Sequence, residues 1–119
     1  MNQYEVADEI AAVIPEVKTE ISRLVHLKNP FALIRIITRH TRKMVEQHNE
    51  LMTDKCMKLI DSIYRKGDLM IKNAIENVFI FSLDNIFFTC PAGERKQVIR
   101  KVPAGLYALY VKQVYKSGL

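Results

Sequence analysis

Two of the three histidines, His40 and His48, lie in one segment, and imidazole is the commonest metal ligand and general base in proteins. On a helix they would be about 12 Å apart along the axis and about 80° apart around it. That separation is too large for one metal ion. His48 falls on the apolar side of the expected helix, so we interpret it as a histidine at the edge of the core with a hydrogen-bond partner. We predict no metal and no cofactor.

The two cysteines, Cys56 and Cys90, form no C-x-x-C motif and no paired metal spacing. Reduced thiols in a cytoplasmic protein are the expected state. Cys90 ends an apolar segment close to Arg95 and Lys96, and nearby positive charge would lower the pKa of a thiol and make it reactive. The alternative, which we prefer for both residues, is a buried free cysteine.

The known catalytic signatures are absent from the sequence. It contains no glycine-rich phosphate loop, no G-x-S-x-G and no H-E-x-x-H. We assign no catalytic residue, and the sequence favours a function other than catalysis.

Positive charge is the most unusual global property of the chain. Its formal net charge is +5 and its pI is about 9.3. The net charge by segment is −4 for residues 1–20, +5 for 21–49, −1 for 50–90 and +5 for 91–119. The excess therefore lies in two separate segments. These candidate phosphate or partner contacts are Arg35, Arg39, Arg42 and Lys43 in the first segment, and Arg95, Lys96, Arg100 and Lys101 in the second.

If the fold brought these two basic groups to one face, they could follow the phosphates of a nucleic acid. Readers of single-stranded or looped nucleic acid also carry exposed aromatic residues for base stacking. Here four of the five phenylalanines lie in the apolar residues 69–88, apart from the basic groups. We therefore prefer ordinary solvated helix faces and keep nucleic-acid binding as the alternative.

Three tyrosines near the C-terminus are candidate contacts with another protein, because tyrosine is enriched at interfaces. They are Tyr107, Tyr110 and Tyr115. The competing interpretation is that two of them pack inside and the third is merely exposed.

The elements that would position these residues are helices. With 119 residues, 49% hydrophobic and 26% charged, the chain is typical of one globular domain, and we expect residues 1–119 to form it. Four glycines and four prolines leave little material for the turns of a β domain. Apolar residues recur at helical spacing in seven segments. The expected fold is all-α with six or seven helices, over residues 3–14, 15–28, 30–48, 51–66, 69–88, 94–101 and 104–116.

Residues 69–88 are the most apolar segment, but Lys72, Glu76 and Asp84 argue for a core helix rather than a membrane span. The first half has two faces, whereas Ile80, Leu83 and Phe87 rotate into the polar sector of a regular helix. We therefore expect the second half to be buried on nearly all sides. No export signal is visible, since the first twenty residues are acidic.

Short links join the helices into pairs. Residues 48–50 are expected to form a turn, and Gly67 is expected in the left-handed conformation that ends a helix, followed by Asp68 as the cap of the next one. The two pairs, over residues 30–66 and 69–101, suggest stacked helical hairpins of the HEAT type, whose repeat is about 40 residues long.

Four segments carry a resemblance to a known group: Asn29-Pro30-Phe31, Lys66-Gly67-Asp68, NAIENVFIFSL at residues 73–83, and Ser117-Gly118-Leu119. Together they resemble a group of short helical bacterial proteins classed as a domain of unknown function. The resemblance implies an all-α fold without an assigned activity. It also implies partner binding, such as toxin neutralisation, which is suspected of some similar helical domains.

These observations support one main hypothesis, a small cytoplasmic module that binds another protein through a helix face or a groove between hairpins. Nucleic-acid binding through the two basic groups is the alternative.

Overall fold

The computed structural model describes residues 1–24 and 29–118. It is 87% helical with seven helices, and no strand occurs among the described residues, so the all-α prediction is confirmed. The order is α1 (Gln3–Val13), η1 (Pro15–Val17), α2 (Lys18–Leu24), α3 (Pro30–Glu46), α4 (Glu50–Lys66), α5 (Leu69–Ala74), η3 (Ile75–Ile80), α6 (Phe81–Phe88), α7 (Ala92–Lys101) and α8 (Ala104–Gly118). α5, η3 and α6 form one continuous helix. The expected end of the second helix falls on residues 25–28, outside the described residues.

Side-chain caps set where several helices begin. The side chain of Asn29 accepts a hydrogen bond from the backbone N–H of Ala32, and Pro30 occupies the first position of α3. Asp68 accepts from the N–H of Ile71 at 3.0 Å and caps α5 in the same way. Both caps are confirmed as predicted.

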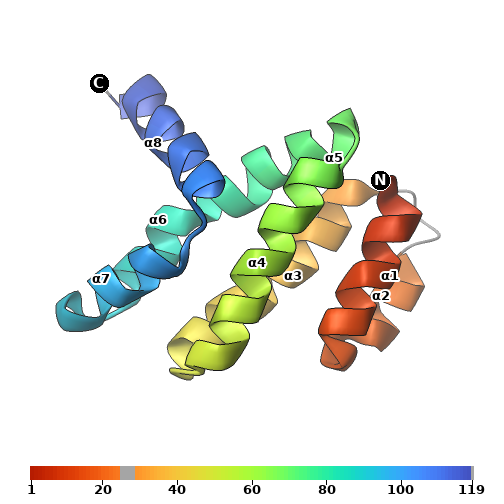
Figure 1. Cartoon of the computed structure of the whole chain (residues 1–119), viewed down its shortest axis with the longest axis horizontal. Helices are drawn as coiled ribbons and strands as arrows, with labels where there is room; N and C mark the ends of the chain where they lie inside the picture. The colour runs from red at the N-terminus through yellow and green to blue at the C-terminus, as the bar shows by residue number, and fades with distance from the viewer. Residues whose placement is uncertain (25–28, 119) are drawn as a thin grey trace.

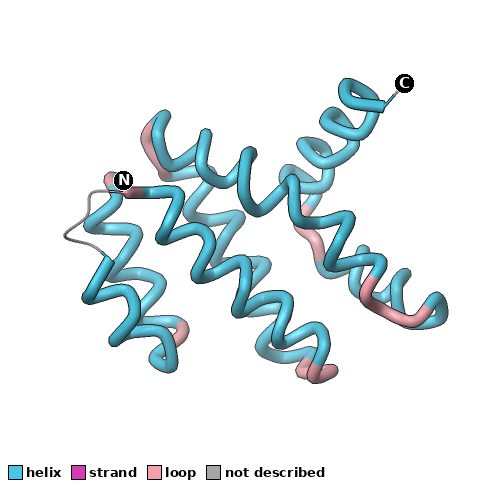
Figure 2. The backbone as a smooth tube through the Cα atoms, turned by 180° about the vertical axis from the view of Figure 1, so that it is seen from behind, coloured by secondary structure: helices cyan, strands magenta, loops and turns pink. Residues whose placement is uncertain are grey.

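The helices lie in two layers. The molecule measures 40 × 31 × 19 Å, and its shortest dimension matches two stacked helices. Figure 1 shows α1, α4, α7 and α8 in front of α2, α3 and the continuous helix α5–η3–α6, and Figure 2 shows the same arrangement from behind. Each successive hairpin therefore contributes one helix to each layer.

α3 lies at the centre of the core. It packs against α1, α2, α4, α5, η3 and α6. Leu33, Ile34 and Ile37 are almost fully buried, as their spacing predicts, and Ile36 is buried as well. On the remaining face, Arg35, Arg39 and Lys43 are exposed to solvent. The core consists largely of isoleucine, leucine and valine side chains.

The middle of the continuous helix is wound more widely than an α-helix. η3 is a π-helix, which holds one more residue than the same length of α-helix. One extra residue turns everything that follows it by about 100° relative to a regular α-helix. Leu83 and Phe87 consequently face the core, with exposed fractions of 0% and 3%, instead of the polar sector.

The same rotation turns two phenylalanines outward. Phe81 is 77% exposed and Phe88 is 68% exposed. The prediction that the second half of this helix is buried on nearly all sides is therefore wrong. It assumed a regular α-helical period, and that period ends at η3.

Two further local predictions need correction. Gly67 does not take the left-handed conformation; it is extended, with φ −70° and ψ 151°. A glycine is nonetheless needed there because a Cβ would lie 2.6 Å from Cγ2 of Ile71. The expected turn between α3 and α4 is present, but His48 lies in that turn with φ 57° and is exposed rather than at the edge of the core. Its Nδ1 lies 3.3 Å from Oε2 of Glu94.

Candidate functional site

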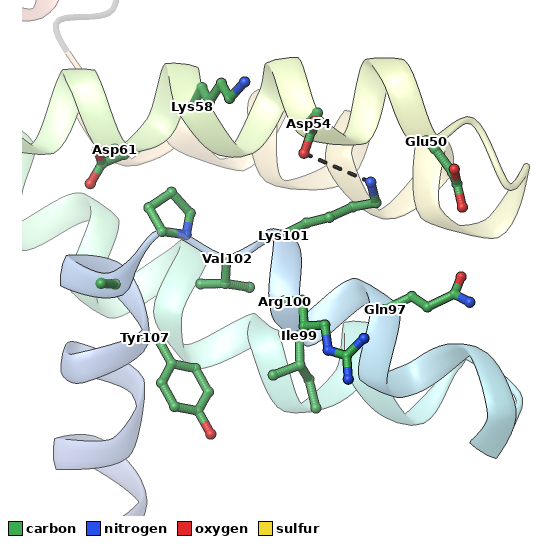
Figure 3. Close-up of a pocket in the computed structure, with 12 residues that line it drawn as sticks. Glu50, Asp54, Lys58, Asp61, Gln97, Ile99, Arg100, Lys101, Val102 and Tyr107 are labelled. Atoms are coloured by element: carbon green, nitrogen blue, oxygen red, sulfur yellow. Dashed lines mark ion pairs between the residues drawn. The ribbon is translucent and has the colours of Figure 1, made fainter.

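A wide surface groove of about 890 Å³ runs between α4 and the α7–α8 corner. Figure 3 shows α4 along one wall and α7, the connecting residues and α8 along the other. The groove lies where α7 ends at Lys101 and the chain turns at Pro103 into α8. We call it the α4–α8 groove.

Three residues that the sequence analysis singled out line this groove together: Arg100, Lys101 and Tyr107. They came from two separate groups of candidates, the basic residues and the tyrosines. Tyr107 is 39% exposed. The chain turns a corner at Pro103, between the end of α7 and the start of α8.

The opposite wall, on α4, carries three carboxylates and the cation of Lys58. Glu50, Asp54 and Asp61 project from α4 into the groove. Their spacing of four and seven residues places them within about 40° of one another around the helix. These carboxylates were not predicted as site residues, because the net charge of residues 50–90 taken together is only −1. The helical spacing of these three carboxylates was the signal that could have revealed them.

One ion pair crosses the groove. Nζ of Lys101 lies 3.8 Å from Oδ1 of Asp54, as the dashed line in Figure 3 marks. The Lys101 side chain is 22% exposed, and that of Asp54 is 43% exposed. A partly solvated pair of this kind contributes little to stability and can exchange for other charged groups.

The groove continues along α4 into a second hollow of about 520 Å³. Asp61, Pro103 and Ala104 line both parts, and Leu109 and Tyr64 line the continuation. The combined surface offers apolar side chains along the corner and cations on the α7 wall. The α4 wall carries carboxylates together with the cations of Lys58 and Arg65. This arrangement suits a peptide segment that carries both apolar and charged side chains.

The remaining basic candidates lie elsewhere. Arg39 and Lys43 line a different groove, of about 500 Å³, between η1–α2 and α3. There Nη2 of Arg39 donates to Oε2 of Glu20 at 3.0 Å. Arg35 is exposed and Arg42 is partly buried on α3. Arg39 and Lys43 of the first group therefore line a different groove from Arg100 and Lys101 of the second.

His40 belongs to this second groove. Its side chain is 10% exposed, and Nε2 lies 3.9 Å from Oε2 of Glu16. Burial lowers the pKa of His40 below its usual value, the nearby charge of Lys43 acts in the same direction, and Glu16 opposes the shift. Among the described residues, no group of three or more His, Cys, Asp or Glu side chains is placed to hold a metal ion.

The side chains of Arg95 and Tyr110 both contact other residues of the protein. Nε of Arg95 donates to the carbonyl of Phe87 at 3.1 Å, and its guanidinium lies 4.8 Å from the ring centre of Phe88. The hydroxyl of Tyr110 donates to Asp84. Lys96 and Tyr115 are exposed, on α7 and near the end of α8.

The structure buries both cysteines. Cys56 is 0% exposed and Cys90 is 7% exposed. Burial raises the pKa of the Cys90 thiol, Glu94 raises it further, and Arg95 only partly opposes this. A raised pKa keeps the sulfur in its unreactive thiol form, which supports the preferred interpretation of a buried free cysteine.

No helix in the part of the chain that the structure describes is both long and apolar enough to cross a membrane. A comparison with curated proteins and one with solved structures give no match. The HEAT-like relationship therefore stays a prediction.

A family model matches most of the chain. It is described as a domain of unknown function (DUF7674) and covers residues 7–116. The resemblance to a helical domain of unknown function is confirmed, while the bacterial origin stays a prediction. The helices that build the α4–α8 groove lie almost wholly within the matched residues. The chain belongs to the DUF7674 family.

Proposed function

We propose that this protein is a binding module that holds a segment of another protein in the α4–α8 groove. The observation that carries the proposal is the convergence of Arg100, Lys101 and Tyr107 with the α4 carboxylates along one continuous groove. Its apolar corner and two charged walls match the composition of protein interfaces, where an apolar centre is surrounded by polar groups. The segment we expect places apolar side chains over Ile99 and Pro103 and a basic side chain opposite Asp61.

The charge pattern explains how such a segment would be selected. Asp54 already pairs with Lys101, and Glu50 has no ion pair among the described residues. Oδ2 of Asp61 pairs with Nε of Arg65 on its own helix at 3.3 Å. A basic partner side chain competes only with that exposed pair, which is weak in water. Opposite charges across an interface add specificity more than affinity.

Nucleic-acid binding is less well supported. Three of the eight basic candidates already have acceptors within the protein: Arg39 with Glu20, Arg95 with Phe87, and Lys101 with Asp54. Of the remaining cations, Lys43 and Arg100 line separate grooves, so a phosphate backbone in either groove would meet only one of these two. A mobility-shift assay at about 50 and 200 mM salt tests this alternative, since phosphate contacts predict a steep loss of affinity.

The decisive experiment uses two matched variants. Ala104→Arg places a long charged side chain in the groove, where Ala104 lines both parts. Ala92→Arg makes the same change at the first residue of α7, which is likewise exposed but lies outside the groove. Both substitutions occur at the first position of a helix, so their effects on folding should be similar.

We expect a stoichiometric partner to be captured from a lysate of the source cells by the wild type and by Ala92→Arg, and to be lost with Ala104→Arg. Thermal unfolding of both variants checks that the fold is retained. Equal capture by all three proteins, or no stoichiometric partner at several salt concentrations, would contradict the proposal.

A further inference from the structure

The groove that Arg39 and Lys43 line, between η1–α2 and α3, contains a buried nitrogen without a partner. We call it the α2–α3 groove. The side chain of His40 lines this groove and is 10% exposed. Its Nε2 is buried and has no hydrogen-bond partner among the described residues. Buried polar atoms in proteins are nearly always hydrogen-bonded, because leaving one unpaired is costly. A molecule from solvent is therefore expected to supply the missing bond.

His40 is suited to accept this hydrogen bond. Burial lowers the pKa of its imidazole, Glu16 opposes the shift and Lys43 adds to it. The ring is therefore neutral near pH 7, and a neutral imidazole with its proton on Nδ1 presents a lone pair at Nε2. Oε2 of Glu16, on η1, lies 3.9 Å from Nε2. One nitrogen that donates two hydrogen bonds of about 2.9 Å can reach both atoms.

The charges of the groove match a molecule that carries both signs. Nη2 of Arg39 pairs with Oε2 of Glu20 at 3.0 Å, which leaves Glu16 and Lys43 as the available carboxylate and cation. Lys43 is exposed and forms no ion pair with the described residues. A bound cation without a negative group would be repelled by Lys43, and a bound anion without a positive group by Glu16. A zwitterion avoids both repulsions.

Apolar side chains complete the lining of the groove. Val17, Ile36 and Met44 are buried, and Met52 on α4 is partly buried. Methionine adapts to apolar groups of different shapes, because its side chain is unbranched and flexible. The volume of about 500 Å³ lies within the usual range of small-molecule sites, about 300–1,000 Å³. The groove thus combines an apolar surface with a few polar groups, as such sites do.

We propose that the α2–α3 groove binds a free α-amino acid with an apolar side chain. The ammonium group of the amino acid donates to Nε2 of His40 and to the carboxylate of Glu16. Its carboxylate pairs with Lys43, and its side chain lies against Met44 and Met52. This site is separate from the α4–α8 groove, so it does not depend on the protein partner proposed there.

Isothermal titration calorimetry of the full chain near pH 7 tests the class of ligand. The probes are L-leucine, L-methionine and L-phenylalanine, and we expect at least one of them to bind in a 1:1 ratio. Two analogues of leucine, 3-methylbutylamine without the carboxylate and 4-methylpentanoate without the ammonium group, should bind at least about tenfold more weakly. Equal binding of either analogue contradicts the zwitterion. If no amino acid binds at up to about 20 mM, water alone bonds to Nε2 and the inference is wrong.

His40→Phe separates a role in binding from a role in folding. Phenylalanine retains a buried ring and removes Nε2, which makes no hydrogen bond to the described residues. We expect this variant to unfold at the temperature of the wild type or higher, and to bind the amino acid at least about tenfold more weakly. Unchanged affinity in the folded variant overturns the assignment of His40.

Substitutions of exposed charges provide matched controls that do not disturb the core. Glu16→Gln and Lys43→Gln each remove one charge from the groove, whereas Glu46→Gln and Lys55→Gln remove the same charges from exposed positions outside it. We expect the first two variants to weaken binding about fivefold, and the controls to bind like the wild type. Equal affinity in all four variants overturns the placement of the site. Capture of a protein partner by the α4–α8 groove should be the same in all four.

Discussion

The hydroxyl of Tyr110 on α8 donates a hydrogen bond to the carboxylate of Asp84 on α6. The tyrosine ring also meets Phe87 edge to face, with ring centres 5.3 Å apart. This contact, together with the bond from Gln113 to the carbonyl of Glu76, holds α8 against the long helix. Burial, followed by the bond to Asp84 and its negative charge, raises the pKa of Tyr110 to about 12.

The raised pKa predicts a loss of stability in alkaline solution. The folded protein holds the Tyr110 proton more tightly than the unfolded chain, whose tyrosines titrate near pH 10. The stabilisation is therefore complete below about pH 10 and is lost as pH rises toward 12. Asp84→Asn removes the negative charge and should move the pKa of Tyr110 back toward 10. Ultraviolet absorbance of tyrosinate against pH measures the shift, and an unchanged titration in Asp84→Asn would contradict the assignment.

The surroundings of Gly67 and Gly93 predict opposite effects on stability when each is replaced by alanine. At Gly67 a Cβ would lie 2.6 Å from Cγ2 of Ile71 and 2.7 Å from the carbonyl oxygen of Ile63, so Gly67→Ala should cost about 1–3 kcal/mol of unfolding free energy. At Gly93, in the first turn of α7, a Cβ meets nothing within 4 Å. Gly93→Ala should therefore stabilise the protein by about 0.4–1 kcal/mol. Urea unfolding measures both, and a neutral Gly67→Ala would be inconsistent with this packing.

The π-helix η3 predicts that one deletion is tolerated and another is not. Deleting Asn77 turns η3 into a regular α-helix and leaves α6 in its present rotation, because the extra residue itself is removed. Deleting Ser82 instead rotates Leu83, Ile86 and Phe87 by about 100° out of the core.

Circular dichroism during heating distinguishes the two deletions. We expect cooperative unfolding to persist without Asn77 and to disappear without Ser82. The Asn77 deletion loses only one exposed hydrogen bond, from the Asn77 side chain to the carbonyl of Asn73. If both deletions abolished cooperative unfolding equally, the rotation of α6 would not depend on the π-helix η3.

The burial of the two thiols predicts slow labelling. Cys56 and Cys90 are 0% and 7% exposed, and burial raises the pKa of each. A thiol reagent at pH 8 should therefore modify both at least about tenfold more slowly in the native protein than in urea. Mass spectrometry of the labelled peptides follows each cysteine separately. Rapid native labelling of Cys90 alone would revive the hypothesis of a reactive thiol.

The features that sequence analysis predicted correctly depend on neighbours along the chain. The starts of α3 and α5 could be predicted from Asn29-Pro30 and Asp68, because a capping side chain bonds only to the first turn of its own helix. The burial of Leu33 and Ile37 follows from spacing along one regular helix. A helix cap and a helical spacing pattern can each be recognised from residues that are close together in the sequence.

The features that were missed depend on contacts between distant segments. The wide turn η3 places both Ile75 and Leu83 in the core. The apolar residues that enter the polar sector of a regular helix are its local sign, but they were interpreted as burial on all sides. The α4–α8 groove combines carboxylates from residues 50–61 with cations from residues 100 and 101. Spacing could identify each half, but only the tertiary fold places the two halves opposite each other.

The end of α6 is completed by a side chain from the next helix. Arg95 donates to the carbonyl of Phe87, which also accepts from the N–H of Cys90, and to the carbonyl of Cys90, just after the end of α6. The last turn of α6 therefore loses these partners whenever α7 separates from it. Amide hydrogen exchange should then follow a single opening for the end of α6, α7 and α8, distinct from the slower exchange of α3 and α4. The C-terminal hairpin and its final helix would open and close as one cooperative unit.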